Sequence, residues 1–257
     1  MSEKCALSVV VLTKNEAARI ARCLASVAWA DEVVVVDDES TDDTVTICRT
    51  FTGTILRRKM DLEGRHRNWA YAQARHEWVL SLDADEVVTP GLRDEITRVL
   101  AGNPLENGFT IPRRNFIGDY WVRHGGWYPS PQLKLFRREK FRYEEVAVHP
   151  RAIMQDPCGH LKGDLLHYSY RDIEDFLAKL NNQTTREAQK WFGQKRPMTL
   201  RRFLWRTIDR FLRSYVGKQG FRDGYIGYVL AYFAALYQWI SFLKYQEIVR
   251  SEKRKMR

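Results

Sequence analysis

The first part of the chain alternates between short apolar runs and stretches with helical periodicity. Residues 7–12 form a continuous apolar, valine-rich run, which is typical of a strand buried on both faces, and residues 32–36 form a second, β-branched run. Further strands are predicted at residues 54–56 and 78–82, and helices at 15–27, after Thr41 and at 67–75. Ser40 or Thr41 can cap the second of these helices. This alternation indicates right-handed βαβ units and an α/β fold with a mostly parallel sheet.

Beyond Pro90 the pattern changes. A helix is predicted at about residues 92–100, followed by Gly-, Pro- and aromatic-rich sequence to about residue 170, in which 109–111 and 132–136 have the pattern of strands. Residues 172–192 and the last stretch, 199–246, follow helical spacing. We therefore expect an α/β domain over residues 1–170 and a helical extension over residues 171–257.

Charge is distributed unevenly between the first hundred residues and the rest of the chain. Residues 1–100 hold 13 Lys and Arg against 17 Asp and Glu, whereas the rest holds 29 against 15, for a net charge of +10. A basic second part indicates an anionic partner, such as nucleic acid, a phosphorylated glycolipid or an anionic membrane. The four cysteines lack CxxC spacing, so free thiols in a reducing compartment and no zinc site are expected. The first residues lack a signal-peptide pattern, so we expect a cytoplasmic location.

Polar side chains stand at the ends of three predicted strands, in segments 13–16, 37–38 and 83–85. Ligands of open α/β sheets bind beyond the carboxyl ends of the strands, so these segments are expected to share one site. Asp83 and Asp85 alternate in an extended segment and direct two carboxylates at different edges of a small ligand. Mg²⁺ and Mn²⁺ prefer one or two carboxylates with phosphate oxygens, so a divalent metal and a diphosphate leaving group fit this pair.

The surrounding motifs resemble a known family. LSVVVLTKNEAARIARCLASV, EVVVVDDESTDDT and RNWAYAQARHEWVLSLDADE are together similar to the nucleotide-binding half of family 2 glycosyltransferases, which have the GT-A fold. The resemblance covers about residues 5–90 and implies that residues 1–90 bind a nucleotide sugar. It implies these roles: Thr13, Asn15 and Glu16 line the nucleotide pocket, Asp37 binds the base with Asp38 beside it, Arg67 and Asn68 lie near the ribose and diphosphate, Asp83 faces the ribose, and Asp85 binds the metal.

The second half resembles a narrower group. GGWYPSPQLKLFRRE, VHP, LLHYSYRDIEDFLAKLN and the basic, aromatic C-terminus are similar to the WaaE/KdtX-type lipopolysaccharide core glucosyltransferases. Such enzymes add glucose to the inner-core heptose of lipid A–core, which implies that residues 91–170 form the acceptor side. The chain departs from that group at Ser130-Pro131, where an acidic residue is common, and at Pro150, where Glu is usual. Both departures leave the acceptor and the transferred sugar open.

An inverting transferase needs a base that takes the proton of the acceptor hydroxyl. Glu144 and Glu145 are the first candidates, although either can be an ordinary surface glutamate. His149 ranks below them, and Asp119 is the next alternative.

Three further residues have two interpretations each. His167 follows an apolar pair, so it is either a buried core histidine or, as the resemblance implies, a late metal ligand with a neutral imidazole. Trp127 and Tyr128, beside Gly125-Gly126, are either core aromatics or a face on which an acceptor sugar stacks.

The C-terminal stretch indicates a membrane surface. From Leu200 to Tyr215 apolar residues follow helical spacing, with five arginines between them and Asp209 as the only acid. A basic amphipathic helix of this kind is typical of an interfacial anchor. Residues 225–243 are long enough to span a bilayer, but Gln238 and several tyrosines favour a helix in the interface or paired with the first. Alternatively, both helices simply cover the catalytic domain.

Together these features predict an inverting, metal-dependent transfer of a sugar, first of all glucose, from a UDP-sugar to a lipopolysaccharide core or other cell-envelope glycolipid. A polyprenol-phosphate sugar transferase shares the nucleotide half but would need several membrane spans. A nucleotidyltransferase would need a Gly-rich basic loop near its N-terminus. A basic nucleic-acid-binding protein would fit the isoelectric point near 9.5, but here the basic residues alternate with large apolar ones, so no nucleic-acid partner is expected.

Overall fold

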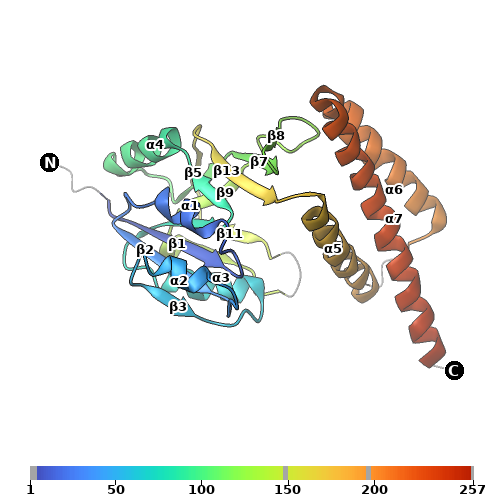
Figure 1. Ribbon diagram of the computed structural model, residues 1–257, viewed down its shortest axis with the longest axis horizontal. Coiled ribbons are helices and arrows are strands. Elements are labelled where there is room, and N and C mark those ends of the chain that lie inside the picture. The colour runs from blue at the N-terminus through green and yellow to red at the C-terminus, as the bar shows by residue number, and fades with distance from the viewer. Residues whose placement is uncertain (1–4, 147–149, 195–197, 256–257) are drawn as a thin grey trace. The chain divides into compact units, whose positions relative to one another are not determined.

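The computed structural model of the protein describes residues 5–146, 150–194 and 198–255 (Figure 1). It divides the chain into two compact units. The first comprises Met1–Arg114 and Ser130–His167, and the second comprises Asn115–Pro129 and Tyr168–Arg257. The segment Asn115–Pro129 therefore belongs with the C-terminal helices, although its sequence places it inside the region expected to form the α/β domain.

A seven-stranded mixed sheet lies at the centre of the first unit, with the strand order β12-β6-β9-β4-β1-β2-β3. The parallel pairs are β1 with β2 and β4, β2 with β3, and β6 with β12, while β9 is antiparallel to β4 and β6. The predicted mostly parallel sheet is confirmed, and residues 109–111 and 132–136 lie in β6 and β9. The strands are β1 Leu7–Thr13, β2 Glu32–Asp37, β3 Ile55–Arg57, β4 Trp78–Asp83, β6 Gly108–Ile111, β9 Gln132–Arg137 and β12 Cys158–His160.

Both faces of this sheet are covered, which explains the continuous apolar runs of β1 and β4. Successive side chains of a strand point to opposite faces. Alternate residues of both strands, including Val9 and Leu80, pack in one buried cluster with α1 (Ile20–Ala25) and α4 (Pro90–Ala101). Val10 and Val79 instead pack on the other face, in a cluster with α3 (Glu63–Ala72). The carboxyl ends of β1 and β4 are therefore held by packing on two sides.

Two helix starts differ from the sequence-based expectation. Asn15 has a left-handed φ of +52°, so the chain turns before α1 begins at Ile20. Neither Ser40 nor Thr41 caps α2 (Thr44–Cys48), so that prediction is wrong. The Ser40 hydroxyl instead accepts a hydrogen bond from the Asn15 amide at 2.9 Å. The polar turn after β2 is thus used to join two loops of the site edge rather than to begin a helix.

Short strands complete the first unit. β5 (Glu86–Val88) is antiparallel to β13 (Leu165–Tyr170), with His167 opposite Glu86. β10 (Phe141–Tyr143), which follows the turn η1 (Arg138–Lys140), is antiparallel to β11 (Ala152–Met154). The first pairing brings a histidine from late in the chain next to the acidic segment that follows β4.

The second unit consists of three long helices and the β7–β8 hairpin. Helices α5 (Ile173–Gly193) and α6 (Leu200–Leu212) both pack against α7 (Gly224–Lys255) (Figure 1). Asp172 caps α5 and Thr199 caps α6, each accepting a backbone N–H of the first turn. Between α6 and α7 lie the turns η2 (Arg213–Gly217) and η3 (Gly220–Asp223). The hairpin strands are β7 (Arg113–Ile117) and β8 (Tyr120–Val122).

Hydrogen bonds explain why Asn115–Pro129 joins the helices. Asp223 accepts the His124 amide at 2.7 Å and lies 3.0 Å from the His124 Nδ1 atom. The Gly125 amide donates to the Lys218 carbonyl at 2.9 Å. These links bind the loop after β8 to the η2–η3 turn.

One helical stretch, Gly220–Arg254, has the length and composition of a membrane span within the described residues. Its most apolar window has a mean hydropathy of 1.4, and 33% of that window is buried against the rest of the protein. The helix is longer than residues 225–243, over which the sequence predicts it.

Candidate active site

A cavity of about 290 Å³, named here the donor cavity, opens at the carboxyl ends of β1 and β4. Strand register creates it, because Thr13 pairs with Asp37 and Leu12 with Asp83, so the three polar strand ends are level. Its lining residues come from these ends and from α3: Leu12, Thr13, Lys14, Glu16, Asp38, Met60, Glu63, His66, Arg67, Asp83, Ala84 and Asp85. Residues from each of the predicted segments 13–16, 37–38 and 83–85 therefore line one cavity at this edge.

Asp83 is held by two cations from different elements. Arg67 Nη2 donates to Asp83 Oδ1 at 3.0 Å, and Lys134 Nζ donates to Asp83 Oδ2 at 3.0 Å. Burial would raise the pKa of Asp83, but these two cations hold that pKa well below its usual range. Asp83 is therefore an ionised and fixed acceptor, with both oxygens already engaged by the protein.

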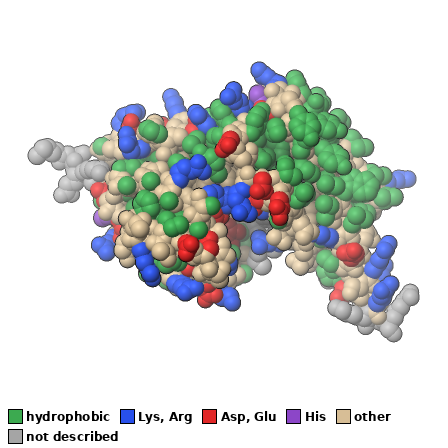
Figure 2. All heavy atoms as spheres, viewed as in Figure 1, with side chains coloured by type: hydrophobic (Ala, Val, Ile, Leu, Met, Phe, Trp, Pro, Cys, Tyr) green, Lys and Arg blue, Asp and Glu red, His purple; other side chains and the backbone are tan. Residues whose placement is uncertain are grey.

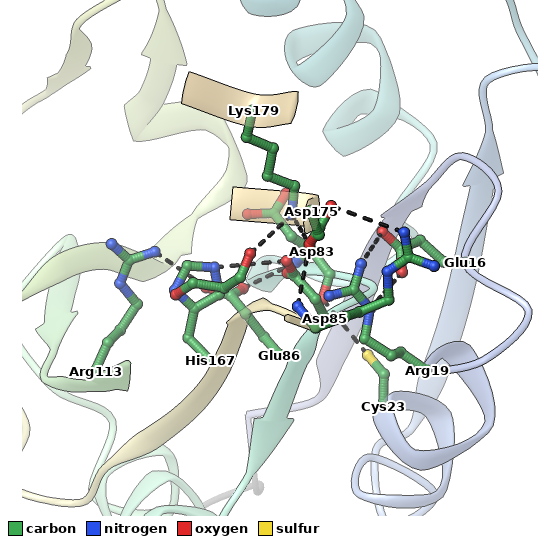
Figure 3. Close-up of polar contacts among 12 residues, drawn as sticks. Glu16, Arg19, Cys23, Asp83, Asp85, Glu86, Arg113, His167, Asp175 and Lys179 are labelled. Carbon is green, nitrogen blue, oxygen red and sulfur yellow. Dashed lines mark hydrogen bonds and ion pairs between the residues drawn. The ribbon is translucent and has the colours of Figure 1, made fainter. Parts of the chain in front are cut away.

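Lys134 also reaches the buried Glu86. Its ammonium lies 2.6 Å from Glu86 Oε2, and Arg113 Nη1 lies 3.5 Å from Glu86 Oε1. Burial would lower the pKa of Lys134, but Asp83 and Glu86 raise it above its ordinary value. Asp83, Glu86 and their cations thus form one charge network, and Asp83 and Arg67 of this network line the donor cavity (Figure 3).

Sequence reasoning missed this network. The available signal was a lysine at the centre of the apolar strand Gln132–Arg137, where a buried position calls for a paired charge.

Asp85 and His167 face each other across the end of the acidic segment (Figure 3). His167 Nε2 lies 3.6 Å from Asp85 Oδ2, and the two side chains are 19% and 16% exposed. Of the two interpretations of His167, this position beside Asp85 is the one that a metal ligand requires. Its role as a ligand remains a prediction.

The donor set fits a hard divalent cation. In the described part of the chain no three His, Cys, Asp or Glu side chains converge on one point. Mg²⁺ and Mn²⁺ are commonly held by one or two carboxylates, with phosphate oxygens and water supplying the other ligands. Asp85 and His167 would then be the protein ligands, because the charge of Asp83 is already compensated by Arg67 and Lys134.

Two buried polar atoms beside the donor cavity lack partners within the described residues. They are Thr13 Oγ1 and His66 Nδ1. Leaving such an atom unpaired costs roughly 1–3 kcal/mol, so a polar ligand in the cavity would offset that cost. Burial, and then the charge of Arg58, lowers the pKa of His66, so its ring is neutral at pH 7. His66 lies next to the predicted Arg67 in sequence, but no pattern distinguished it.

Three of the predicted nucleotide-binding residues do not line the donor cavity. Asn15 Oδ1 accepts the Thr41 amide at 2.8 Å, and the buried Asp37 accepts the Ser40 amide at 3.0 Å. Their side chains shape the loops that form the cavity wall, and their contacts with a nucleotide remain predictions.

Asn68, the third, fixes a more distant segment. It donates to the Tyr143 carbonyl at 3.0 Å and accepts the Tyr143 amide at 2.7 Å. Asp38, by contrast, lines the cavity and accepts Lys14 at 2.8 Å and the Met60 amide at 2.7 Å.

Glu144 and Glu145 follow β10 and lie in a separate hollow. Arg151 Nη2 donates to Glu144 Oε1 at 2.8 Å, and its hydrogen bonds lower the pKa of Glu144. Glu145 accepts Arg65 Nε at 3.1 Å and Asn68 Nδ2 at 3.4 Å. Neither lines the donor cavity, so the assignment of the base remains a prediction. His149 lies outside the described residues.

Trp127 and Tyr128 belong to the second unit, as does Asp119. The Trp127 carbonyl accepts Asn115 Nδ2, and its ring lies edge-on to Tyr170 at 6.2 Å. Trp127 lines a second cavity, formed within the helical unit. Tyr128 instead packs edge-on against Trp121 at 5.5 Å.

Comparison with known proteins identifies the family. The family model described as glycosyl transferase family 2 matches residues 8–159. One similar relative is the lipopolysaccharide core biosynthesis glycosyltransferase LpsC of Rhizobium meliloti, which is 27% identical over 95% of this chain and 93% of LpsC. Another is the uncharacterized glycosyltransferase RT0209 of Rickettsia typhi, which is 28% identical over 94% of this chain and 87% of RT0209.

A solved structure supports the fold. The mannosyltransferase PcManGT from Pyrobaculum calidifontis, solved with GDP-Man and Mn²⁺, is 14% identical, covers 95% of this chain over 88% of its own, and superposes with a TM-score of 0.56. Together with the mixed sheet and its flanking helices, this likeness confirms the predicted GT-A fold.

Proposed function

We propose a function for this chain on the basis that it belongs to glycosyl transferase family 2. The enzyme moves a sugar from a UDP-sugar to a lipopolysaccharide core or other cell-envelope glycolipid. The transfer inverts the configuration of the anomeric carbon. The observation that carries the donor half is the donor cavity, where Asp85 faces His167 and the buried Thr13 Oγ1 lacks a partner among the described residues. A nucleoside diphosphate supplies both the phosphate oxygens and the polar atoms that such a site accepts.

The residues in and beside the donor cavity have separate roles in binding the metal, the nucleotide and the diphosphate. Asp85 and His167 would hold a divalent ion, which would neutralise negative charge on the departing diphosphate. Thr13 and His66 form hydrogen bonds with the nucleotide. Asp83 accepts a hydrogen bond from a ribose hydroxyl, and Arg67 and Lys134 keep Asp83 ionised. Arg67 lies along the cavity wall, where its guanidinium also stabilises negative charge on the diphosphate.

We propose Glu145, ahead of Glu144, as the base. Arg151 holds Glu144 through several hydrogen bonds and lowers its pKa, which weakens it as a proton acceptor. Glu145 is held next to α3 by Arg65 and Asn68. In the step itself the carboxylate takes the proton of the acceptor hydroxyl, the hydroxyl oxygen bonds to the anomeric carbon, and the bond from that carbon to the diphosphate oxygen breaks.

The acceptor half of the proposal rests on whole-chain similarity to LpsC, whose name assigns it to lipopolysaccharide core biosynthesis. Glucose is the first sugar to test, because the motifs of the second half resemble core glucosyltransferases.

The surface of the helical unit supports the proposal that the enzyme acts at the cytoplasmic face of the inner membrane. Hydrophobic side chains gather on its visible face (Figure 2). Leu204, Ile208 and Leu212 are exposed one turn apart on α6, and Trp205 is exposed next to Leu204. An exposed apolar stripe with arginines beside it is the pattern of an interfacial helix.

A donor screen tests this function directly. UDP-, GDP- and dTDP-sugars are titrated calorimetrically with Mg²⁺ or Mn²⁺, and the best donor is then incubated with core glycolipid lacking its terminal sugars. We expect metal-dependent binding of UDP-sugars and transfer with inverted anomeric configuration, read by NMR. Binding of no nucleotide sugar would contradict the donor half, and binding without transfer to any core glycolipid would contradict the acceptor half.

A further inference from the structure

A second cavity, of about 430 Å³, lies entirely within the helical unit, between α5, α6, α7 and the loop that carries Gly125 and Trp127. We name it the cationic cavity, because one side of its lining consists of Arg206, Arg210, Arg213 and Lys218. The other side is apolar and aromatic and includes Phe176, Leu180, Leu230 and Phe233. The lining therefore combines a polar, charged half with an apolar half.

The cations are positioned by their own elements. Arg206, Arg210 and Arg213 are four and three residues apart on α6 and η2, so they share one helix face. Arg206 Nε donates at 3.0 Å to Oε1 of Gln238, which is only 4% exposed on the otherwise apolar α7. Gln238 thus has a role that the apolar pattern of α7 does not explain, which is to hold Arg206 at the cavity.

Gly125-Gly126 places the fourth cation. Both glycines have positive φ, +65° and +87°, a conformation that side chains with a Cβ rarely adopt. A Cβ on Gly126 would lie 2.6 Å from Lys218 Nζ. The glycine pair therefore lets the Lys218 ammonium lie directly over the backbone of the Trp127 loop, at the edge of the cavity.

Positive charge exceeds negative charge in this lining. Among the described residues Glu187 is the only acid in the lining, and it accepts Trp191 Nε1 at 2.7 Å. Asp209 outside the lining pairs with Arg213 at 2.9 Å. Across the described ranges, no carboxylate lies within ion-pair distance of Arg210 or Lys218. Cations beside apolar walls focus the potential, so the cavity attracts an anion.

We propose that the cationic cavity binds the phosphate group of a phosphorylated glycolipid, with its sugar against Trp127. Arginine forks match phosphate oxygens, lysine adds a point charge, and the apolar half contacts the carbon skeleton of the sugar or lipid. A membrane lipid is favoured over free phosphate, because α6 also exposes Trp205 and Ile208, residues suited to a bilayer surface. This inference rests on the proposed function only in identifying that lipid with the acceptor.

Vesicle binding without any donor tests the site. The full-length protein is sedimented with phosphatidylcholine vesicles that contain either phosphatidic acid, as a phosphomonoester probe, or phosphatidylglycerol at equal surface charge. We expect tighter binding to the phosphomonoester vesicles. Arg210→Gln and Lys218→Gln should each weaken that binding roughly tenfold, the loss of one hydrogen bond between charged groups. Arg201→Gln removes the same charge from α6 outside the cavity lining, so it should weaken binding to both kinds of vesicle alike and leave the preference for the phosphomonoester unchanged.

Several results would overturn the inference. Equal losses of this preference in Arg201→Gln and Arg210→Gln would mean attraction to surface charge alone. Competition by inorganic phosphate as effective as that by the lipid would mean a free-phosphate site. Circular dichroism checks that each variant folds.

Failure of the inference and failure of the proposed function are distinguishable. UDP-sugar binding by calorimetry should be the same in Arg210→Gln as in the wild type, whereas the KM for a phosphorylated acceptor should rise. If the protein binds no UDP-sugar yet shows cavity-dependent lipid binding, the proposed function fails and the inference stands. If it transfers sugar with an unchanged acceptor KM in Arg210→Gln, the inference fails alone.

Discussion

The donor cavity and the cationic cavity differ in where their counter-charges come from. In the donor cavity, Asp83 receives Arg67 from α3 and Lys134 from β9. In the cationic cavity, no described carboxylate lies within ion-pair distance of Arg210 or Lys218. In the donor cavity the fold itself places the charges that compensate Asp83. In the cationic cavity a bound anion would have to compensate Arg210 and Lys218.

Burial explains the difference. Glu86 and Lys134 lie deep in the first unit, where an uncompensated charge costs several kcal/mol, so each must be paired before any ligand arrives. Arg210 and Lys218 are exposed, and water solvates them at little cost until an anion displaces it. A fixed network suits a reaction that needs its groups pre-oriented, and a solvated cluster suits the capture of a charged, mobile acceptor.

The largest effect is expected at Asp85. Asp85→Asn removes the carboxylate ligand of the predicted metal and leaves His167 as its protein ligand, so turnover should fall by roughly a thousandfold or more. Calorimetry should show that metal-dependent UDP binding is lost as well. Asp94→Asn, an exposed acid on α4, is the matched control. Wild-type turnover in Asp85→Asn would remove the metal assignment.

Lys134→Met tests whether the donor-side network is compensated by the fold. It leaves the buried Glu86 without its closest cation, so the free energy of unfolding should drop by roughly 3–5 kcal/mol. Urea denaturation measures the loss, and Lys140→Met, at an exposed lysine in η1, should change stability by less than about 0.5 kcal/mol. Adding Glu86→Gln to Lys134→Met should restore part of the loss, and a further loss instead would show that the pair does not act as a unit.

Glu145→Gln distinguishes the base from its neighbour. Transfer should fall roughly a hundredfold or more, while UDP-sugar binding stays unchanged, because a base contributes to the chemical step alone. Glu144→Gln should reduce transfer much less. A larger defect in Glu144→Gln than in Glu145→Gln would reverse the assignment.

Trp205→Ser should reduce binding to anionic vesicles roughly tenfold. The indole is 69% exposed on α6, and transferring a large apolar side chain from water contributes about 1.5–3 kcal/mol. Leu105→Ser is the control, because Leu105 is 90% exposed on the first unit. Equal losses in both variants would mean that general surface hydrophobicity, not α6, holds the protein at the membrane.

The smallest effect concerns His66 and pH. Its pKa in the folded protein lies below the ordinary 6.5, because burial disfavours the charged ring. Below about pH 6.5 the unfolded chain then binds a proton that the folded protein does not, so stability should fall as the pH falls through this window and level off above it. His66→Gln should reduce that slope in pH-dependent denaturation, and an unchanged slope would mean that other groups cause it.

Much of the first unit was predictable from its sequence. Apolar and β-branched runs at residues 7–12, 32–36 and 78–82 predict strands covered on both faces, and polar residues directly after them predict a ligand-binding edge. Both signals are local, since burial and alternation act on consecutive residues. The same holds for α5, whose helical periodicity over residues 172–192 is visible in the chain. Together with the family motifs, these patterns are enough to indicate a nucleotide-sugar site.

The partners of the site residues depended on tertiary structure. Lys134 reaches Asp83 because β9 lies antiparallel to β4, and His167 reaches Asp85 because β13 pairs with β5. Asn115–Pro129 joins the helices through Asp223 and Lys218, which brings Trp127 to the cationic cavity. Periodicity records which face of an element is buried but not which distant element covers it. Strand order and register decide that, and with it the counter-charges of both cavities.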